Sequence, residues 1–384
     1  MNMDGTLTEE EQLISDSFRA YCEKAVRPAQ EEWNRERKFP REIMKDISEL
    51  VLPATVAGHD SRGPSESSIG LISELMGRYE FPVPGFLTMH FAKMLPLVAD
   101  EEVREKYLGR YLKGDLVICG AFTEPGAGSD SAAISTSAVG RNGRFIVNGE
   151  KAFVSSPIMA DAHIISLRTG EMDMERPHRG VSLLLVDVRT DGVEPYGMEH
   201  MATVFNGDFG GIRFNDAEVP CGNIIGSQGK GFVTLMEVLN TQRVHVALYS
   251  IGIAEQAIEE AIEYARIRKT FGQPISRHEA ISFRLAESWT KLQASRLLAF
   301  RALALQENGK ENSAECAAVK WYGCEAAFEA ASNALQTLGA SGYVTSSAME
   351  RRFRATRGFL IGDGTPDIQK MIISRRLFGR EFSP

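Results

Sequence analysis

The sequence predicts a mainly α-helical protein with a central β-domain: an N-terminal helical domain, a small β-barrel-like domain and a C-terminal four-helix bundle. Three observations support this layout. Apolar residues recur at helical spacing in the first part of the chain, short β-rich runs follow from about Leu116, and long helical patterns return after the glycine-rich "GSQGKG" (residues 226–231). A doubly wound sheet fits badly, because the strand patterns do not alternate with helical ones.

The N-terminal helical domain is expected over residues 1–115. The stretch "TLTEEEQLISDSFRAYCEKAV" contains Thr8 with Glu11 three residues later, which is the spacing of a capping box at the start of a helix. Further helical patterns cover residues 42–50, 69–79 and 102–112.

The middle β-domain is expected over residues 116–228. Its strand candidates are short, apolar and rich in β-forming residues: "LVICGAF", "FIVNGEKAFV", "AHIISLR" and "VSLLLVDV". The dipeptides Asn142-Gly143 and Asn148-Gly149 are typical of tight hairpin turns. Together these signals predict a mostly antiparallel sheet.

The C-terminal domain is expected over residues 229–384 as a four-helix bundle. Small and apolar residues recur there at intervals of three and four, as they do on the buried face of a helix: Ala247, Ile251, Ala254, Ile258, Ala261 and Ala265. Two later stretches, "HEAISFRLAESWTKLQASRLLAFRALAL" and "SAECAAVKWYGCEAAFEAASNALQTLG", are each long enough for one bundle helix.

Composition restricts the class of protein. The chain has 384 residues, 43% of them hydrophobic, and a net charge of −8, which argues against nucleic acid as the main partner because phosphate binding needs a basic face. No apolar run approaches the ~18 residues of a membrane span, and the acidic start resembles neither a signal nor a transit peptide. Five cysteines without a C-x-x-C pattern indicate reduced thiols in a cytoplasmic protein, with Cys316 and Cys324 filling the core.

Common catalytic signatures are absent from the sequence. It has no H-E-x-x-H, no G-x-S-x-G, no Walker A loop and no complete dinucleotide fingerprint, and its single histidines predict no metal site. Three glycine-containing stretches stand out instead. "FTEPGAGSD" (122–130) has the composition of a loop between strands, whereas "RIRKTFGQPI" (266–275) and "LQTLGASGY" (335–343) each indicate a helix end when taken alone.

Taken together, these stretches resemble the acyl-CoA dehydrogenase family over nearly the whole chain. The matching segments are "FTEPGAGSD", "NGEKAFVSS", "ARIRKTFGQPI", "LQTLGASGY" and "GDGTPDIQ", in the order and spacing of the family. The first and third segments are highly specific for the family, whereas the last two are degraded copies of the family motifs. The resemblance implies a helical domain, a β-domain and a four-helix bundle, assembled as a homotetramer.

The resemblance also implies an FAD site between the β-domain and the bundle, with part of the cofactor reaching a neighbouring subunit. The residues that match cofactor contacts form two groups. One group contacts the flavin and the acyl-CoA, and the other holds the diphosphate and adenine side of the FAD, where Arg268 and Phe271 match an arm that reaches a partner subunit's cofactor. The first group comprises Phe122, Thr123, Gly128, Ser129, Phe153, Ser155 and Thr365, and the second comprises Arg268, Phe271, Gln336 and Gly339.

Asp363, in "FLIGDGTPDIQK", matches the position of the base that removes the α-proton of the acyl thioester, which is Glu in most relatives. Such a proton is weakly acidic, so a positioned carboxylate must take it while the β-hydride goes to the flavin. Three positions depart from the family pattern. Asp363 is one methylene shorter than Glu, Gly362 stands where relatives have a bulky residue, and Ala355 stands where an acid is common. These departures suggest a non-linear acyl group, such as an alicyclic or branched one. Some relatives carry the base before the arginine matched by Arg243, but here that position is Gln242.

Four residues are expected on the substrate side. Ser129, Arg243 and Gly364 match positions beside the acyl-CoA, and the flanking glycines allow the backbone to approach it closely. His90, in "FLTMHFAKMLP", is a candidate for the acyl end of the pocket, although a buried, hydrogen-bonded histidine is the simpler interpretation of a single His.

The leading hypothesis is an FAD-dependent acyl-CoA dehydrogenase that passes electrons to an electron-transferring flavoprotein. A second hypothesis keeps the fold but reverses the reaction, as an enoyl-CoA reductase, or takes the acyl group on a carrier protein. A third is a non-catalytic assembly or binding subunit, which the altered base loop suggests and the retained carboxylate opposes.

Overall fold

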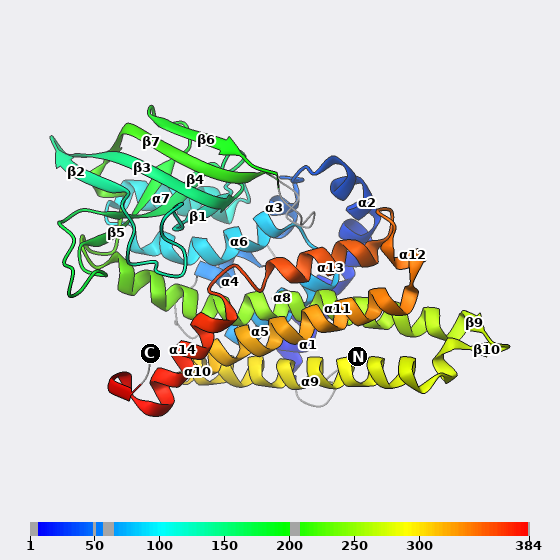
Figure 1. Ribbon diagram of the computed structural model, residues 1–384. Coiled ribbons are helices and arrows are strands. Elements are labelled where there is room, and N and C mark those ends of the chain that lie inside the picture. Colours follow the sequence, from blue (N-terminus) through cyan, green and yellow to red (C-terminus); the bar gives the residue numbers. More distant parts are fainter. Residues whose placement is uncertain (1–6, 49–50, 57–64, 200–207, 383–384) are drawn as a thin grey trace.

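The computed structural model describes residues 7–48, 51–56, 65–199 and 208–382. Helices form both ends of this described chain, and strands form its middle, as Figure 1 shows. The predicted order of helical, β and helical parts is therefore confirmed. Within the described residues, no helix is long and apolar enough to cross a membrane.

The first part of the chain is helical. It contains the helices α1 (Glu9–Tyr21), α2 (Arg27–Glu36), α3 (Ile43–Asp46), α4 (Leu52–Val56), α5 (Glu66–Arg78), α6 (Val83–Phe91) and α7 (Glu101–Leu112), with short non-α turns at Cys22–Val26 and Ala92–Leu97. The predicted capping box is present, because the Thr8 hydroxyl accepts a bond from the Glu11 N–H and the Glu11 side chain accepts one from Thr8. The helix predicted over residues 42–50 is shorter, and residues 49–50 lie outside the described part.

One mixed, mostly antiparallel sheet forms the middle of the chain. Its strands are β1 (Ile118–Ala121), β2 (Ser137–Arg141), β3 (Arg144–Ser155), β4 (Ala162–Arg168), β5 (Val181–Asp187), β6 (Val193–Gly197), β7 (Phe209–Pro220) and β8 (Ile224–Ile225). The strand order is β6-β7-β3-β2-β4-β5-β8, and β1 pairs with β4 in parallel. All four predicted strand segments appear as β1, β3, β4 and β5.

The two Asn-Gly dipeptides lie in different kinds of structure, one in a turn and one inside a strand. Asn142 and Gly143 form the two-residue turn between β2 and β3, with both residues at positive φ, as predicted. The hairpin predicted at Asn148-Gly149 is wrong, because this pair lies inside β3 at an interruption of its register with β7. Gly149 has φ 139°, and a Cβ there would come within 2.6 Å of the Thr136 Cα. A bulge and a close backbone approach explain this glycine better than a turn.

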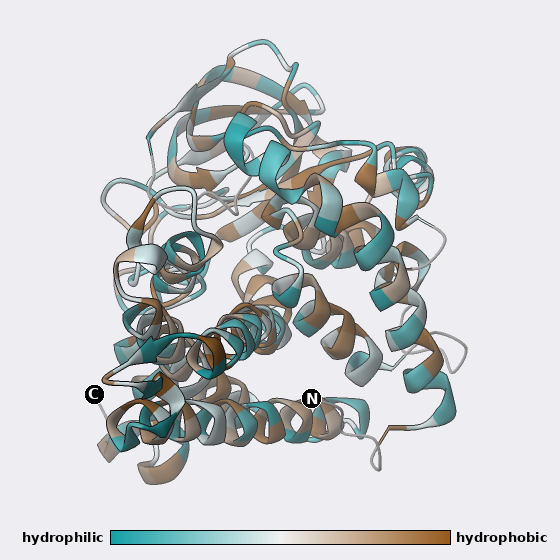
Figure 2. Ribbon diagram, turned by 90° about the vertical axis from the view of Figure 1, so that its right-hand side faces the viewer, coloured by the Kyte–Doolittle hydropathy of each residue, from teal (hydrophilic) through white to brown (hydrophobic). Residues whose placement is uncertain are grey.

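The third part of the chain is a bundle of long helices: α8 (Gly231–Ile267), α9 (Glu279–Glu307), α10 (Ser313–Ala318), α11 (Cys324–Leu338), α12 (Ala340–Tyr343), α13 (Ala348–Gly358) and α14 (Pro366–Phe378). A short arm, β9 (Lys269–Thr270) and β10 (Gln273–Pro274), joins α8 to α9 at one end (Figure 1). Figure 2 shows hydrophobic and hydrophilic stretches alternating along the helices, as expected when one face of each is buried. Cys316 and Cys324 are buried free thiols, which confirms their predicted place in the core.

The stretch predicted as one helix from residue 313 contains an irregularity. Val319–Gly323 forms a π-helical turn between α10 and α11. Such turns interrupt the regular i to i−4 bonding and are frequent at functional sites. Periodicity alone does not reveal them, because the apolar spacing continues across the turn.

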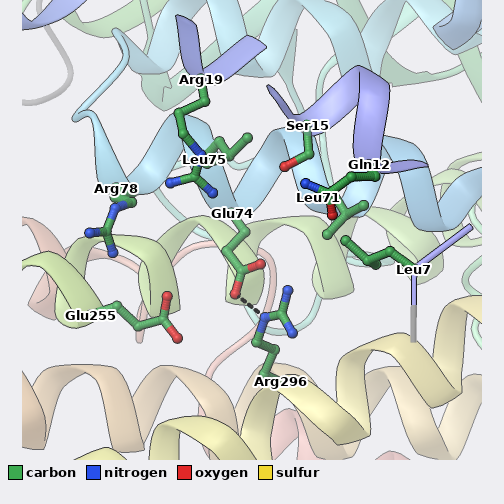
Figure 3. Close-up of a pocket in the computed structure, with 10 residues that line it drawn as sticks. All are labelled: Leu7, Gln12, Ser15, Arg19, Leu71, Glu74, Leu75, Arg78, Glu255 and Arg296. Atoms are coloured by element: carbon green, nitrogen blue, oxygen red, sulfur yellow. Dashed lines mark hydrogen bonds and ion pairs between the residues drawn. The ribbon is translucent and has the colours of Figure 1, made fainter. Parts of the chain in front are cut away.

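Buried ion pairs join the N-terminal helices to the bundle. Glu74 of α5 pairs with Arg296 of α9 at 2.5 Å, and both are less than a tenth exposed. Figure 3 shows this pair on the wall of a polar cavity that α1, α5, α8 and α9 enclose. Glu80 similarly pairs with Arg351 at 2.6 Å and Arg352 at 2.9 Å, both on α13.

The contact between α5 and α8 depends on two glycines. A Cβ on Gly77 would lie 1.8 Å from the Tyr249 carbonyl oxygen, and a Cβ on Gly252 would lie 2.0 Å from that of Glu74. Both distances are far below van der Waals contact with backbone atoms, so the two helices approach as closely as they do only because these side chains are absent.

We expect Gly77→Ala to lower the free energy of unfolding by at least about 1–3 kcal/mol, because the helices must separate to admit the methyl group. The matched control is Gly109→Ala in α7, where a Cβ would meet nothing within 4 Å. That change should be neutral or stabilise by up to about 1 kcal/mol, since Ala is the better helix former. Urea denaturation of both variants measures the difference, and equal stabilities would contradict the close contact.

Candidate functional site

A cavity of about 180 Å³ lies where α6, β1, β3 and α8 meet the loop after α13. It brings together Phe122, Thr123, Phe153, Ser155 and Asp363, five of the residues predicted for the flavin and the base. The remaining lining is mostly apolar and comprises Val83, Leu87, Phe91, Gly120, Ala152, Val154, Gln242, Val246, Gly358, Phe359 and Gly362.

Asp363 occupies an unusual backbone position in this cavity. It has φ 57°, and Gly364 after it has φ 94°. A non-glycine residue in the left-handed region costs on the order of 1–3 kcal/mol and persists only where its surroundings hold it. Gln369 of α14 helps to stabilise this conformation, because its buried amide donates hydrogen bonds to the carbonyl oxygens of Asp363 and Gly364 at 3.0 Å each.

The surroundings of Asp363 raise its affinity for a proton. Burial raises its pKa above the usual value, against the opposing positive charges of Lys320 and Arg243 and a weak hydrogen bond from Gln242. The Gln242 amide nitrogen lies 3.4 Å from both carboxylate oxygens. A carboxylate with a raised pKa on the wall of an apolar cavity is suited to accept a proton from carbon.

Arg243 interacts with Asp363 but is not among the residues that line the cavity. It is 8% exposed, and its Nε has no hydrogen-bond partner among the described residues. Burial lowers its pKa, while the neighbouring Asp363 opposes that shift. Its predicted contact with the acyl-CoA channel stays a prediction. Its positive charge, however, opposes the rise in the pKa of Asp363.

His90 also lies off the cavity wall. Its neighbours on α6, Leu87 and Phe91, line the cavity, whereas its own ring packs between Phe86 at 4.6 Å and His245 at 4.8 Å. Burial and the nearby His245 hold the pKa of His90 well below its usual value, so the ring is neutral at pH 7. The structure thus places His90 in a buried aromatic cluster beside the cavity, and its predicted contact with substrate stays a prediction.

The loop that carries Phe122 and Thr123 is fixed by a buried ion pair. Lys151 of β3 is fully buried, and its ammonium lies 2.8 Å from Glu124 Oε1 and 3.2 Å from the Phe122 carbonyl oxygen. Glu124 also accepts bonds from the backbone N–H groups of Ser135 and Thr136. Burial alone would raise the pKa of Glu124, but Lys151 and these bonds lower it to about 2.

Phe153 and Ser155 reach the cavity from the end of β3. Phe153 sits where the register with β7 shifts, has φ 57° and is 58% exposed. Its ring therefore offers an open aromatic surface, and the hydroxyl-bearing side chains of Thr123 and Ser155 lie on the same cavity. Aromatic faces with nearby hydroxyl groups fit a flat ring system such as the flavin, whose faces are apolar and whose edges form hydrogen bonds.

Other predicted cofactor residues lie outside this cavity. Gly128 and Ser129 are exposed in the loop after β1, and Thr365 is the residue before α14, beside the base loop. Arg268 and Phe271 belong to the β9–β10 arm, where Phe271 is 97% exposed. Gln336 and Gly339 line an open hollow of about 370 Å³ at the end of α11. Figure 1 shows the arm and the loop between α13 and α14 at separate places along the bundle.

Four polar residues that hold the site were missed by the sequence reasoning: Glu124, Lys151, Lys320 and Gln369. A sequence signal existed for Lys320, which lies four residues from both Cys316 and Cys324, on the apolar stripe of its helix. A charged residue on a buried stripe needs a polar partner. The partner itself, a loop some 40 residues later, is not visible in the local pattern.

Comparisons with known proteins match nearly the whole length of this chain. Family models described as Acyl-CoA dehydrogenase N-terminal, middle and C-terminal domains match residues 8–115, 119–217 and 229–378. The chain is 32% identical to a 3-(aryl)acrylate reductase of Clostridium sporogenes, covering 96% of this chain and 99% of the relative. It is 32% identical to the caffeyl-CoA reductase-Etf complex subunit CarC of Acetobacterium woodii, with 96% and 98% covered.

A third relative is the cyclohex-1-ene-1-carbonyl-CoA dehydrogenase of Geobacter metallireducens, 31% identical with 97% and 98% covered. Among solved structures, an acyl-CoA dehydrogenase from Geobacillus kaustophilus superimposes with a TM-score of 0.90, at 31% identity over 97% of this chain and 99% of that one. An FAD complex of PigA also reaches a TM-score of 0.90, at 25% identity over 98% and 100%.

We expect Lys151→Met to lower the free energy of unfolding by about 3–5 kcal/mol, because it leaves the buried Glu124 carboxylate without its cation. Lys291→Met is the matched control, since Lys291 pairs with Glu329 at 2.8 Å on the exposed side of α9. An exposed pair should change stability by less than about 1 kcal/mol. Urea denaturation at neutral pH compares the two, and similar losses would contradict the special role of the buried pair.

Proposed function

Because the chain belongs to the acyl-CoA dehydrogenase family of FAD-dependent oxidoreductases acting on CH–CH bonds, we propose that it dehydrogenates the CoA thioester of an uncharged, non-linear acyl group, with Asp363 as the base. The observation that carries this proposal is the Asp363 carboxylate, held at positive φ on the wall of an apolar cavity with a raised pKa. FAD is the cofactor, and when bound it supplies the acceptor for the hydride that leaves the β-carbon.

The residues of this chain then have separable tasks. Asp363 accepts the α-proton, while Gln242, Lys320 and Arg243 limit how far burial raises its pKa. Phe122, Thr123, Phe153, Ser155 and Thr365 would hold the flavin portion of FAD. With FAD and substrate bound, the apolar cavity wall would keep water away from the carboxylate, which would make it a stronger base than a hydrated one.

The lining favours an uncharged acyl group. Among the described residues that line the cavity there is no arginine, lysine or histidine, and Asp363 is the charged one. An acyl group with a terminal carboxylate would meet no cation and would be repelled by the base. Val83, Leu87, Phe91 and Val246 offer an aliphatic and aromatic surface instead.

Space around the base favours a ring or a branch. Gly358 and Gly362 both line the cavity, and a Cβ on Gly362 would meet nothing within 4 Å. The short Asp side chain leaves further room between the backbone and the substrate. A relative named for a cyclohexene-carbonyl-CoA substrate is similar over nearly the whole chain, so we propose alicyclic acyl-CoAs as the first class to test.

The reverse reaction is the second candidate. Two similar proteins are named as reductases of unsaturated acids or acyl-CoAs. A raised pKa suits this direction too, because a protonated Asp363 could return a proton to the α-carbon. Turnover of an enoyl-CoA by the reduced protein, with no bleaching by any saturated acyl-CoA, would favour the reductase or a carrier-protein substrate.

The proposed partners follow from the same site. The predicted FAD residues lie in several separate places on one chain, and the arm that carries Phe271 is fully exposed at its tip. We therefore propose a homotetramer in which the arm of one copy completes the FAD site of another. An electron-transferring flavoprotein is proposed as the acceptor, since one relative is named as a subunit of an Etf complex.

The function is tested by recording the visible spectrum of the FAD-loaded protein anaerobically while linear, branched and alicyclic acyl-CoAs are added. Bleaching by an alicyclic member supports the proposal. Equal bleaching by linear chains contradicts the pocket argument, and a protein that takes up no FAD favours the non-catalytic hypothesis.

We expect Asp363→Asn to slow this bleaching by about 100-fold to 10,000-fold, the usual contribution of a general base, while the flavin spectrum before addition stays unchanged. Asp367→Asn, an exposed acid in the first turn of α14, is the control and should bleach like the parent protein. An Asp363→Asn protein that bleaches at the parent rate would exclude Asp363 as the base.

We also expect Gly362→Leu to fill the open space beside the base. It should reduce kcat/KM for the alicyclic substrate by at least about 10-fold to 200-fold relative to a short linear one, since a mismatch of even one methylene in an apolar pocket has an effect of this size. Steady-state kinetics with both substrates measure this ratio. A variant that slows both substrates equally would show that Gly362 does not select between them.

A further inference from the structure

Lys320 is a buried lysine whose ammonium group ends at the base loop. It lies in the π-helical turn Val319–Gly323 and is 1% exposed. Its Nζ donates to the Phe359 carbonyl oxygen at 2.6 Å and approaches that of Gly364 at 3.4 Å. A buried ammonium needs such partners, because leaving it without hydrogen bonds in the interior would be very unfavourable.

The two carbonyls that Lys320 contacts lie on either side of Asp363. Phe359 caps the C-terminal end of α13, and Gly364 directly follows the base. Gln369 holds the same segment from α14 through the Asp363 and Gly364 carbonyls. Two buried donors from different helices therefore fix a loop whose positive φ angles are intrinsically unfavourable.

Lys320 also affects the charge of the base. Burial raises the pKa of Asp363, and Lys320 is the strongest of the groups that oppose this shift, ahead of Arg243 and Gln242. Within the described parts of the chain, the other titratable group facing Asp363 is Cys324 of α11, and burial raises the pKa of its thiol, which keeps it neutral. The cations near the base are thus Lys320 from the π-helical turn and Arg243 from α8.

We propose that Lys320 is a positioning residue for the reaction, which orients the Asp363 carboxylate by binding the Phe359 and Gly364 carbonyl oxygens on either side of it. Its positive charge near the loop adds a second, electrostatic effect. This inference rests on the proposed function of Asp363. It also gives the π-helical turn a role, since that turn carries the lysine toward the base loop. A purely structural lysine would affect stability alone, whereas this one should also affect the pH dependence of proton abstraction.

The test compares Lys320→Met and Lys320→Arg in the FAD-loaded protein, with Lys93→Met as the control. Lys93 is a partly buried lysine that pairs with Glu66 at 3.0 Å, so its loss removes a comparable cation from the helical core without touching the loop. The first readout is the rate of anaerobic bleaching as a function of pH. The second is hydrogen–deuterium exchange of residues 359–369 without substrate.

Removal of the cation raises the pKa of Asp363 further, so the base stays protonated up to a higher pH. We expect Lys320→Met to move the acid limb of the pH profile upward by about 1 pH unit or more, and to reduce the plateau rate by about 10-fold to 100-fold through misplacement of the carboxylate. Amide exchange in residues 359–369 should become faster. Lys320→Arg should restore the acid limb, because it restores the charge.

A Lys320→Met protein that binds FAD but keeps both the parent acid limb and the parent exchange rates would overturn the proposal. If that variant does not fold, Lys320→Gln keeps a hydrogen-bond donor without the charge, and its acid limb decides the electrostatic part. If no acyl-CoA bleaches the parent protein, the proposed function fails while the exchange experiment still decides whether Lys320 holds the loop.

Discussion

A carboxylate can remove a weakly acidic proton from carbon only if it is held at the reacting atom and shielded from water. In the reaction proposed for this protein, that constraint falls on the short loop between α13 and α14. The loop places Asp363 at φ 57° and Gly364 at φ 94°, and buried donors from neighbouring helices, Lys320 and Gln369, bind its carbonyl oxygens. The helices around it supply the rigid frame that the loop itself lacks.

The rest of the molecule can be understood as support for this arrangement. Close packing of α5 on α8, allowed by Gly77 and Gly252, fixes the helix that carries Gln242 and Arg243. The Glu124–Lys151 pair fixes the opposite wall, where Phe122 and Thr123 lie. Buried ionic groups thus lie close to the cavity, where the Glu124–Lys151 pair and the Lys320 ammonium are bound by protein groups, and no cation is among the described residues that line the cavity.

Much of the fold could be predicted from the sequence because it depends on local patterns. The Thr8–Glu11 capping box, the strand segments and the long bundle helices all follow from spacing and residue type. The Asn148-Gly149 turn was predicted wrongly, because a bulge in a long strand and a hairpin use the same residues and differ only in what lies opposite. The π-helical turn was missed because the apolar period continues through it.

The candidate site could be predicted only in part, for a related reason. Asp363 and the flavin-side residues were found through short motifs that resemble a known family, and five of them line one cavity. Lys320 and His90 show the limit of such reasoning. The partners of Lys320 lie some 40 residues away in the sequence. His90 packs against His245 of α8 and therefore lies off the cavity wall. Neither contact leaves a signal in the local sequence pattern.

The central claim is that Asp363 takes a proton from the α-carbon of a bound acyl-CoA. Its most direct test is the exchange of the α-hydrogens of a saturated alicyclic acyl-CoA for deuterium in D₂O, followed by mass spectrometry with the parent protein and with Asp363→Asn. We expect exchange with the parent protein and at least about 100-fold slower exchange with the variant. Equal exchange rates in the two proteins would contradict it.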